Sequence, residues 1–441
     1  MGFFALGVAT VVMLATFLLG MHVASSLGLL GLSLLSIFGD RPLWDLAGLV
    51  AWNTNTSFVL VAIPLFLLMG ELLLRSGESD RMYRVLAHWL SPIPGGLLHS
   101  NIAACAVFSA VSGSSVATAA TIGSVALPSF RTRGYDERLV LGSLASGGAL
   151  GNLIPPGIAF IVYGVLMEVS IGQLYIAGIV PGILMTILFM GVILAFALAR
   201  PQMAPREPAV PWPVMLWGLV QMLPTVLLIF LVLGTLYLGV ATPTESAAFG
   251  VSGAFVLALF GRKVNLRMLK ASFLSSARST AVVLLIVTAA FLLNSAFAIL
   301  GIPYAVAKAI TAMQLSPAVT MVAIVVLYLV LGTFMDGFSM MVTTIPVILP
   351  ILKAQHFDLV WFGVLAVMLT EAALISPPEG LNLYVIQAFR TKGPEGQAPG
   401  TIMDVYIGVL PFFAAYVLGI AMVIWWPPLA TWLPTTMKWQ P

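Results

Sequence analysis

Long apolar segments separated by short polar ones are the main feature of the chain. A membrane-spanning helix needs about 20 predominantly apolar residues. Candidate segments recur along the chain: 59–74, 97–128, 139–167, 176–198, 215–240, 247–260, 282–300, 315–350, 360–388 and 407–426. Residues 3–38 hold either one long span or two short spans divided near Gly20–His22. This pattern predicts an all-α polytopic membrane protein.

Polar and amphipathic stretches between these segments predict arm helices that lie along the membrane surface. They are residues 40–55, which are polar and aromatic, 77–90 and 262–270. Residues 201–213 contain five prolines, which is typical of a linker. We therefore expect a first repeat over 1–205 and a second repeat over 206–441.

Two of the apolar segments carry small polar residues at their middle. Ser112–Ser115 interrupts residues 97–128, and Gly332–Ser339 interrupts residues 315–350. Unpaired backbone groups in lipid cost several kcal/mol each, so a helix should break only where the freed groups find partners. The pattern predicts two re-entrant hairpins. For the first segment, a single span with a serine-rich face packed on a neighbouring helix is the alternative.

Each predicted hairpin is followed by a span that contains two consecutive prolines. These prolines remove amide donors and bias the preceding residue away from the helical conformation. They interrupt residues 139–167 at 147–157 and residues 360–388 at 376–380. We therefore expect one broken transmembrane helix in each half.

The two halves repeat one another at a spacing of 222 residues. Pro128 then corresponds to Pro350, and Pro155–Pro156 corresponds to Pro377–Pro378, with no gap between them. Basic residues precede the first hairpin, whereas residues 301–320 carry only Lys308. The hairpins are therefore predicted to enter from opposite sides. This is an inverted repeat of the transporter type, which places the binding site near the bilayer midplane.

Composition and charge support a membrane location and exclude several other classes. The chain is 60% hydrophobic and 8% charged, whereas soluble domains carry about 25% charged residues. Fifteen of its 19 lysines and arginines lie in polar segments at 75–84, 131–138, 200–206, 262–278 and 390–392. They indicate cytoplasmic loops under the positive-inside rule rather than a nucleic-acid surface. The single cysteine, Cys105, excludes an internal disulfide and a cysteine-based metal site.

Oxygen-bearing residues at the tips and breaks predict sites for sodium, a hard cation that accepts neutral oxygen ligands. The first half offers Ser112, Gly113, Ser114, Ser115, Thr118, Gly147, Gly151, Asn152 and Pro155. The second half offers Gly332, Asp336, Ser339, Thr343, Thr370, Ser376 and Pro377. We expect a first site at Ser112, Ser114 and Asn152, and a second at Gly332, Asp336 and Ser376. Half-helix N-termini that point inward would favour an anionic substrate.

Carboxyl groups within apolar sequence tend to face a cavity or a partner. We interpret Glu71 and Glu168, near the ends of spans, as interfacial, and Glu245 in Thr-Pro-Thr-Glu as a helix cap. Asp336 could coordinate a cation or cap a helix.

Glu371 lies deep within an apolar segment and has two interpretations. It could couple charge to transport, or it could pair with a base such as Arg138 or Lys353.

Catalysis has little support in the sequence. A serine hydrolase would need a base beside Ser114, and none of the four histidines (His22, His88, His99 and His356) pairs with it in the pattern. No zinc-protease motif, phosphate-binding loop or redox cysteine pair occurs. A channel would need a pore, and inverted broken hairpins suit alternating access better. We expect no enzymatic activity.

Several long runs resemble the large membrane subunit (the M or DctM type) of tripartite ATP-independent periplasmic (TRAP) transporters. These runs are GSSVATAATIGSVALP, GYDERLVLGSLASGGALGNLIPPG, GIVPG and ATPTESAA. The resemblance covers essentially the whole chain. Ser112–Ser115 and Gly147–Asn152 match the first hairpin tip and its facing break in that family. Gly332–Ser339 and Ser376–Gly380 match the second pair.

The resemblance implies a multi-pass transporter of the bacterial inner membrane that imports a carboxylate by an elevator mechanism, with sodium as the coupling ion and no other cofactor. It also implies two partners. One is a periplasmic binding protein (P type) that delivers the substrate, and the other is a small four-helix membrane subunit (Q type). No four-helix module precedes the large-subunit pattern, so the small subunit should be a separate polypeptide. The alternatives are a stand-alone sodium/carboxylate symporter and, less favoured, an intramembrane hydrolase.

Overall fold

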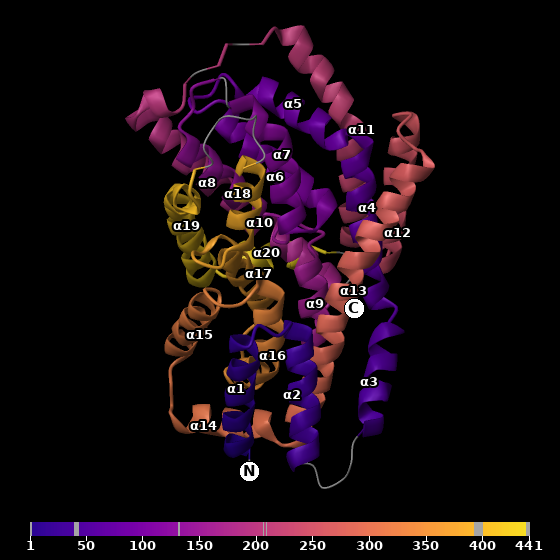
Figure 1. The fold of residues 1–441 in the computed structure, drawn as a ribbon, viewed down its shortest axis with the longest axis vertical. Helices are drawn as coiled ribbons and strands as arrows, with labels where there is room; N and C mark the ends of the chain where they lie inside the picture. The colour runs from indigo at the N-terminus through magenta and orange to yellow at the C-terminus, as the bar shows by residue number, and fades with distance from the viewer. Residues whose placement is uncertain are drawn as a thin grey trace.

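The computed structural model describes residues 2–38, 44–130, 133–205, 207–208, 210–391 and 400–437, all in helices and the turns between them (Figure 1). The helices of the first half are α1 (Gly2–Leu18), α2 (Val23–Phe38), α3 (Trp44–Asn55), η1 (Val59–Val61), α4 (Ala62–Ser76), α5 (Glu78–Leu90), α6 (Leu97–Ser112), α7 (Ser115–Phe130), α8 (Glu137–Gly148), α9 (Ile158–Met167), α10 (Ile171–Ala199) and η2 (Pro201–Met203). Those of the second half are α11 (Trp212–Tyr237), α12 (Pro243–Phe260), α13 (Leu266–Ile299), α14 (Ile302–Ala312), α15 (Pro317–Leu331), α16 (Gly337–Ala354), α17 (Leu359–Ile375), α18 (Leu381–Thr391), α19 (Ile402–Trp425) and α20 (Pro428–Thr435). The predicted all-α membrane fold is confirmed, since seven helices in the described part of the chain are long and apolar enough to cross a bilayer.

Both re-entrant hairpins are present. α6 ends at Ser112, and the chain turns through Gly113, whose φ of +60° lies in the left-handed region that favours glycine. The alternative of one continuous span over 97–128 is therefore wrong. The second hairpin joins α15 to α16 through residues 332–336. In Figure 1, α6 and α7 lie in the upper half of the molecule and α15 and α16 in the lower half, so the hairpins enter from opposite ends.

Both broken helices are present as well. Residues 149–157 separate α8 from α9, and residues 376–380 separate α17 from α18. The Pro155–Pro156 and Pro377–Pro378 peptide bonds are cis. A shift of 222 residues places each of α5 to α9 on its counterpart among α14 to α18, to within about three residues at most ends.

The structure shows how many helices the N-terminal segment forms, and it contradicts one of the predicted arm helices. Residues 3–38 form two helices, α1 and α2, that meet at residues 19–22. The predicted separate arm over 262–270 is wrong, because α13 continues without a break for 34 residues. No glycine or proline occurs in 266–299 to end it. In the repeat, the helix that corresponds to α5 is α14. The predicted arm over 40–55 corresponds to α3, and residues 39–43 lie outside the described part of the chain.

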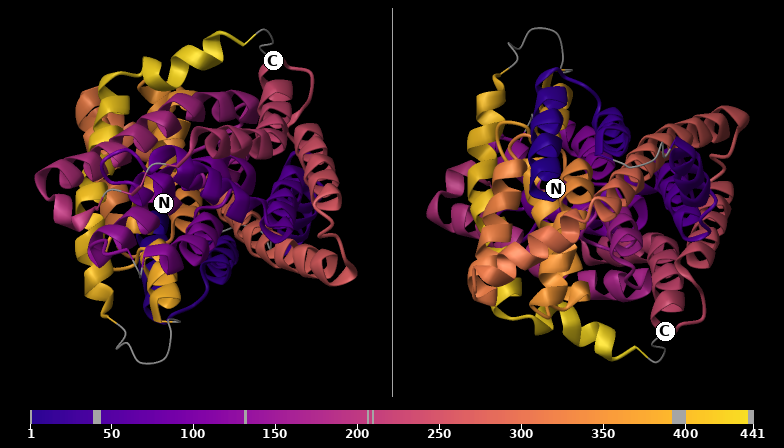
Figure 2. Two further views of the ribbon diagram at one scale, coloured as in Figure 1. Left: turned by 90° about the horizontal axis from the view of Figure 1, so that it is seen from above. Right: turned by 90° about the horizontal axis from the view of Figure 1, so that it is seen from below.

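The end views show how the helices are grouped. In Figure 2, α12 and the first part of α13 form one edge of the molecule, while the hairpins and broken helices gather on the other side. α11 exposes large apolar side chains, among them Trp212, Trp217 and Phe230. Such a face suits lipid or a membrane partner.

Small residues allow close helix contact beside the first broken helix. A Cβ atom added at Gly142 on α8 would overlap the backbone of Gly408 on α19. Membrane helices commonly approach each other through such small residues, because van der Waals packing is the main attraction available between them.

We expect Gly142→Ala to destabilise the protein by about 1–3 kcal/mol, the usual cost of overpacking. Gly191→Ala on α10 is the matched control, because a Cβ there meets nothing within 4 Å. Thermal unfolding of the purified variants in detergent tests this. Equal midpoints for the two variants would contradict the close contact.

Candidate functional site

The tip of the first hairpin is docked onto the first broken helix. The Ile158 amide donates a hydrogen bond to the carbonyl oxygen of Gly113 over 3.2 Å. A Cβ at Gly113 would lie 2.6 Å from the carbonyl oxygen of Pro156, and one at Gly151 would overlap the backbone of Ser115. Glycine is therefore required on both sides of this contact.

Three buried side chains connect this junction to the second repeat. Ser115 Oγ donates to Glu371 Oε2 over 2.5 Å. Asn152 Nδ2 donates to Glu371 Oε1 over 2.8 Å and to Ser115 Oγ over 3.0 Å, and the Asn152 amide also donates to Ser115 Oγ over 3.1 Å. Glu371 is 1% exposed and lies on α17, more than 200 residues from its partners. The network therefore links the first hairpin, the first break and the second broken helix.

These bonds fix the orientation of the Asn152 side-chain amide. A carboxylate accepts hydrogen bonds only, so the group that faces Glu371 must be the NH₂. Asn152 Oδ1 then remains buried with no hydrogen-bond partner. A buried acceptor without a partner is uncommon in folded proteins and suggests an ion or a water.

A small cavity of about 60 Å³ lies beside this network and receives side chains from both repeats. Its polar lining consists of Ser114, Ser115, Asn152, Asp336, Thr370 and Glu371. The space suits one small ion or a few waters. Among the described residues, the lining contains two carboxyl groups and no lysine, arginine or histidine. Its electrostatics therefore favour a cation.

The second hairpin tip packs on α17. Asp336 caps α16, because its Oδ1 accepts hydrogen bonds from the amides of Phe338 and Ser339 over 3.1 and 3.2 Å, and its Oδ2 accepts from Ser339 Oγ. A Cβ at Gly337 would lie 2.9 Å from Thr370. The cap interpretation of Asp336 is confirmed, and the same residue also lines the cavity.

Five predicted site residues (Ser114, Ser115, Asn152, Asp336 and Thr370) line the cavity, and the others lie around it. Ser112 Oγ hydrogen-bonds Thr118 Oγ1 over 2.8 Å inside the hairpin. Gly147 packs against Cys105, and Gly332 packs against Ala373. The remaining ones lie in the tips, the breaks and α16: Gly113, Gly151, Pro155, Ser339, Ser376 and Pro377. Thr343 lines a different cavity, between α1, α2, α13, α15 and α16.

The predicted pairing of Glu371 with Arg138 or Lys353 is wrong. Among the described residues, no base lies within ion-pair distance of Glu371, and Arg138 pairs with Asp404 over 3.0 Å. The true partners, Ser115 and Asn152, were both candidate site residues. A buried carboxyl group six residues before the second Pro-Pro was the available signal, but the sequence did not show which residues it meets.

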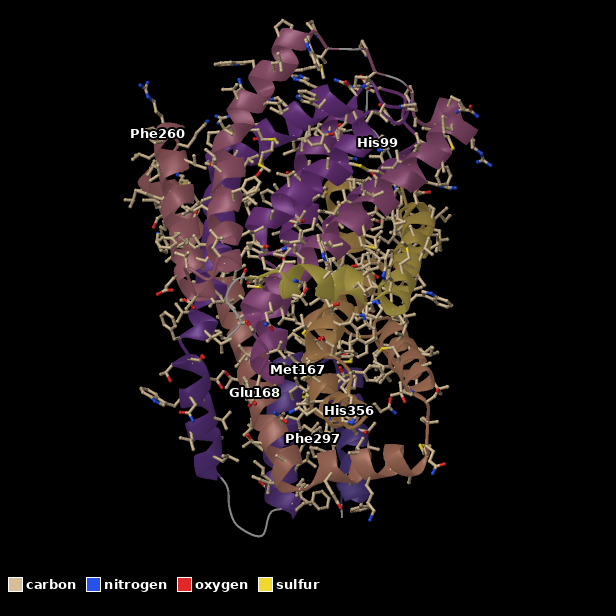
Figure 3. The ribbon with its side chains drawn as sticks, turned by 180° about the vertical axis from the view of Figure 1, so that it is seen from behind. His99, Met167, Glu168, Phe260, Phe297 and His356 are labelled. Carbon is tan, nitrogen blue, oxygen red and sulfur yellow. The ribbon has the colours of Figure 1, made fainter. Side chains whose placement is uncertain are left out.

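The other acidic residues lie away from the cavity. Glu245 forms the predicted capping box with Thr242. Glu71 pairs with Arg75 over 3.0 Å and accepts a hydrogen bond from Ser275. Glu168 is exposed at the end of α9 (Figure 3).

A catalytic base for Ser114 is not found in the described structure. Figure 3 shows His99 near one end of the molecule and His356 towards the other, and His99 Nε2 lies 2.9 Å from the carbonyl oxygen of Pro94. No histidine lines the cavity within the described residues. Within the described residues the arrangement therefore offers no serine–histidine pair at Ser114.

Comparison with known proteins gives consistent results. The family model described as "Tripartite ATP-independent periplasmic transporter, DctM component" matches residues 10–429. The C4-dicarboxylate TRAP transporter large permease protein DctM of Pseudomonas aeruginosa is 34% identical over 369 residues, covering 82% of this chain and 84% of that protein. The protein of the same name from Rhodobacter capsulatus is 31% identical over 449 residues, covering 96% and 98%. The crystal structure of the Alcanivorax borkumensis YdaH transporter has a similar fold, with a TM-score of 0.63, 17% identity and coverage of 95% and 99%.

We expect Ser115→Ala and Glu371→Gln to be coupled, because both variants disturb the same 2.5 Å hydrogen bond. Each should lower the thermal unfolding midpoint, and the double variant should lose less than the sum, with a coupling of about 0.5–3 kcal/mol. Combining Ser115→Ala with Ser252→Ala is the control, because the Ser252 hydroxyl bonds only its own helix. Additive losses in both pairs would show that the network does not join the repeats.

Proposed function

The chain belongs to the family of DctM components of TRAP transporters, and from this membership we propose that it imports an organic acid with sodium as the coupling ion. As a large permease of this family it is a secondary transporter of the inner membrane and not an enzyme. The proposed sodium coupling rests on one observation above the others, which is the unpartnered Asn152 Oδ1 beside the central cavity.

The hydrogen-bond inventory indicates which oxygens could bind sodium. Ser115 Oγ donates one bond and accepts two, so it has no lone pair left and acts as a positioning group. Thr118 Oγ1 donates to the Ser114 carbonyl, so Ser112 Oγ must donate to Thr118. Ser112 Oγ accepts from the Ser114 amide over 3.5 Å and keeps one lone pair free. We therefore propose that Asn152 Oδ1, Ser112 and Ser114 bind the first ion.

A second ion would bind beside this cavity, on the side of the second tip and break, because the cavity itself has room for one small ion. We propose Asp336 as its main ligand, with oxygens of Gly332 and Ser376 from the second tip and break. Asp336 already accepts hydrogen bonds from two amides and from Ser339, but a carboxylate has about four lone-pair positions and can accept one more partner.

The acidic character of the cavity gives a reason why substrate binding would be coupled to sodium binding. Asp336 lines the cavity and no base does so among the described residues, so an anionic substrate would meet a like charge there. Bound cations would remove that repulsion and make the carboxylate's binding dependent on sodium. The inverted hairpins around a central site support an elevator type of alternating access.

The substrate and the partners follow from the family. The relatives from P. aeruginosa and R. capsulatus are named for C4-dicarboxylates, and we propose an organic acid of this general class for this chain. A periplasmic binding protein of the P type would deliver it. A small four-helix subunit of the Q type would cover exposed apolar helices such as α11.

We expect Asn152→Ala to raise the sodium concentration for half-maximal uptake at least about tenfold, the lower limit typical for loss of a group that orients or binds a metal. Ser114→Ala should have a smaller effect in the same direction. The measurement is sodium-driven uptake in liposomes that contain all three components. Sodium-dependent thermal stabilisation, with potassium as the comparison, gives a second readout.

Ser124→Ala, on the exposed side of the same hairpin, is the matched control because its hydroxyl bonds only Thr121 of its own helix. It should keep the wild-type sodium dependence. If Asn152→Ala also keeps it, the assignment of the cation site fails.

We further expect the permease alone, reconstituted without the other two components, to show no substrate uptake under a sodium gradient. Adding only the small subunit should not restore it, because the binding protein delivers the substrate. Uptake by the chain alone would favour the stand-alone symporter instead.

A further inference from the structure

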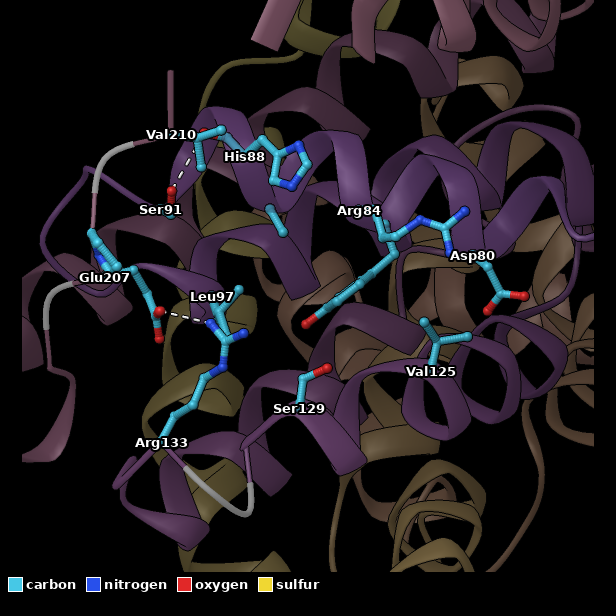
Figure 4. Close-up of a pocket in the computed structure, with 13 residues that line it drawn as sticks. Asp80, Arg84, His88, Ser91, Leu97, Val125, Ser129, Arg133, Glu207 and Val210 are labelled. Carbon is cyan, nitrogen blue, oxygen red and sulfur yellow. Dashed lines mark hydrogen bonds and ion pairs between the residues drawn. The ribbon is translucent and has the colours of Figure 1, made fainter. Parts of the chain in front are cut away.

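A second cavity, of about 560 Å³, lies at the other end of the first hairpin (Figure 4). One face of α5 forms one wall, with Asp80, Arg84 and His88 spaced four residues apart and so aligned along the helix. Val125 and Ser129 of α7 and Arg133 of the following loop form the opposite wall. Basic side chains therefore enter the cavity from both walls.

The basic groups differ in how they are paired. Arg133 Nη1 lies 2.6 Å from Glu207 Oε2, and this ion pair is close to neutral. Among the described residues, no carboxylate lies within ion-pair distance of Arg84, although Asp80 is one turn away. Asp80 and Arg84 are both exposed, so solvent weakens the attraction between them. The guanidinium of Arg84 is thus the strongest free donor in the cavity, with the His88 ring one turn further along.

The cavity is amphipathic and lies at interfacial depth. Ala87, Leu97 and Val125 add an apolar surface beside the charged groups. The adjacent residue Trp89 forms an aromatic pair with Trp212 at a centroid distance of 5.5 Å. Tryptophans of this kind mark the headgroup region of a bilayer. The same end of the molecule carries most of the basic residues, which is the cytoplasmic side under the positive-inside rule.

We propose that this cavity binds the phosphate group of a membrane phospholipid, with Arg84 as the main ligand and His88 beside it. A guanidinium matches the oxygens of a phosphate through two parallel hydrogen bonds. Basic pockets between helices on the cytoplasmic side suit lipid headgroups, which are also the most abundant anions at this depth. The apolar part of the lining would hold the glycerol and the first methylene groups of the lipid.

This proposed site is separate from the sodium site. α6 and α7 have 16 residues each, so the hairpin is about 24 Å long. The central cavity is at its tip and the lipid cavity is at its base. A lipid there would contact both the arm helix α5 and the hairpin, and so could affect how the hairpin moves against the arm.

The test uses the full chain in nanodiscs that contain phosphatidylglycerol and phosphatidylethanolamine, followed by native mass spectrometry to count retained phospholipids. We expect Arg84→Gln to lose one tightly retained phospholipid and to bind added lipid about tenfold more weakly, as expected for loss of a charge-assisted hydrogen bond. Arg84→Lys should recover part of the binding. Arg267→Gln, which removes an exposed charge at the same end, should behave as wild type.

A second measurement distinguishes a lipid headgroup from a free phosphate. Inorganic phosphate is added to delipidated wild type and Arg84→Gln in detergent, and thermal unfolding is followed. Stabilisation of the wild type alone would support the same phosphate chemistry with a soluble source. If wild type and Arg84→Gln retain equal amounts of lipid and phosphate stabilises neither of them, the proposal is overturned.

Discussion

A backbone polar group in the hydrocarbon of a bilayer must have a partner, and this requirement governs the centre of the protein. Two hairpins end and two helices break at mid-depth, which releases carbonyls and amides in the region where water is scarce. The first tip lies against the first break, and the second tip packs on α17 just before the second break. The contact between Ile158 and Gly113 and the glycines that permit it are the clearest example. Because the partners are other parts of the same chain, the irregular segments are held in one place.

The same requirement for hydrogen-bond partners determines which polar atoms remain free at the central cavity. Once Ser115 and Glu371 have taken the two amide hydrogens of Asn152, the remaining oxygen has no partner and faces polar space. It is one of several buried polar atoms without a partner among the described residues, and of these it is the one whose residue lines the central cavity. Such an arrangement is costly unless something occupies the position, and a coupling ion would do so. The hydrogen bonds that hold the hairpin tip and the oxygen proposed to bind the ion thus belong to one network.

Much of this organisation could be predicted from sequence, because it depends on local signals. Consecutive prolines and mid-span serines identify the breaks and tips, and the spacing of 222 residues relates the halves. The partners of Glu371 could not be predicted in this way, since they lie 219 and 256 residues away and no local pattern encodes that meeting. The prediction of a separate arm helix at 262–270 was wrong for a different reason. The charges of this segment resemble those of a surface helix, but no glycine or proline ends that helix before residue 299.

The unbroken helix α13 has a mechanical consequence. Its 34 residues give a rod of about 51 Å, while the hydrocarbon layer is about 30 Å thick. A rod of this length must lean or protrude, and it crosses the end views of Figure 2 obliquely. Because α13 contacts α16 as well as α2 and α4, a thinner or thicker membrane would change its inclination and press on the second hairpin. The thickness of the host membrane would in this way bear on the position of the second hairpin.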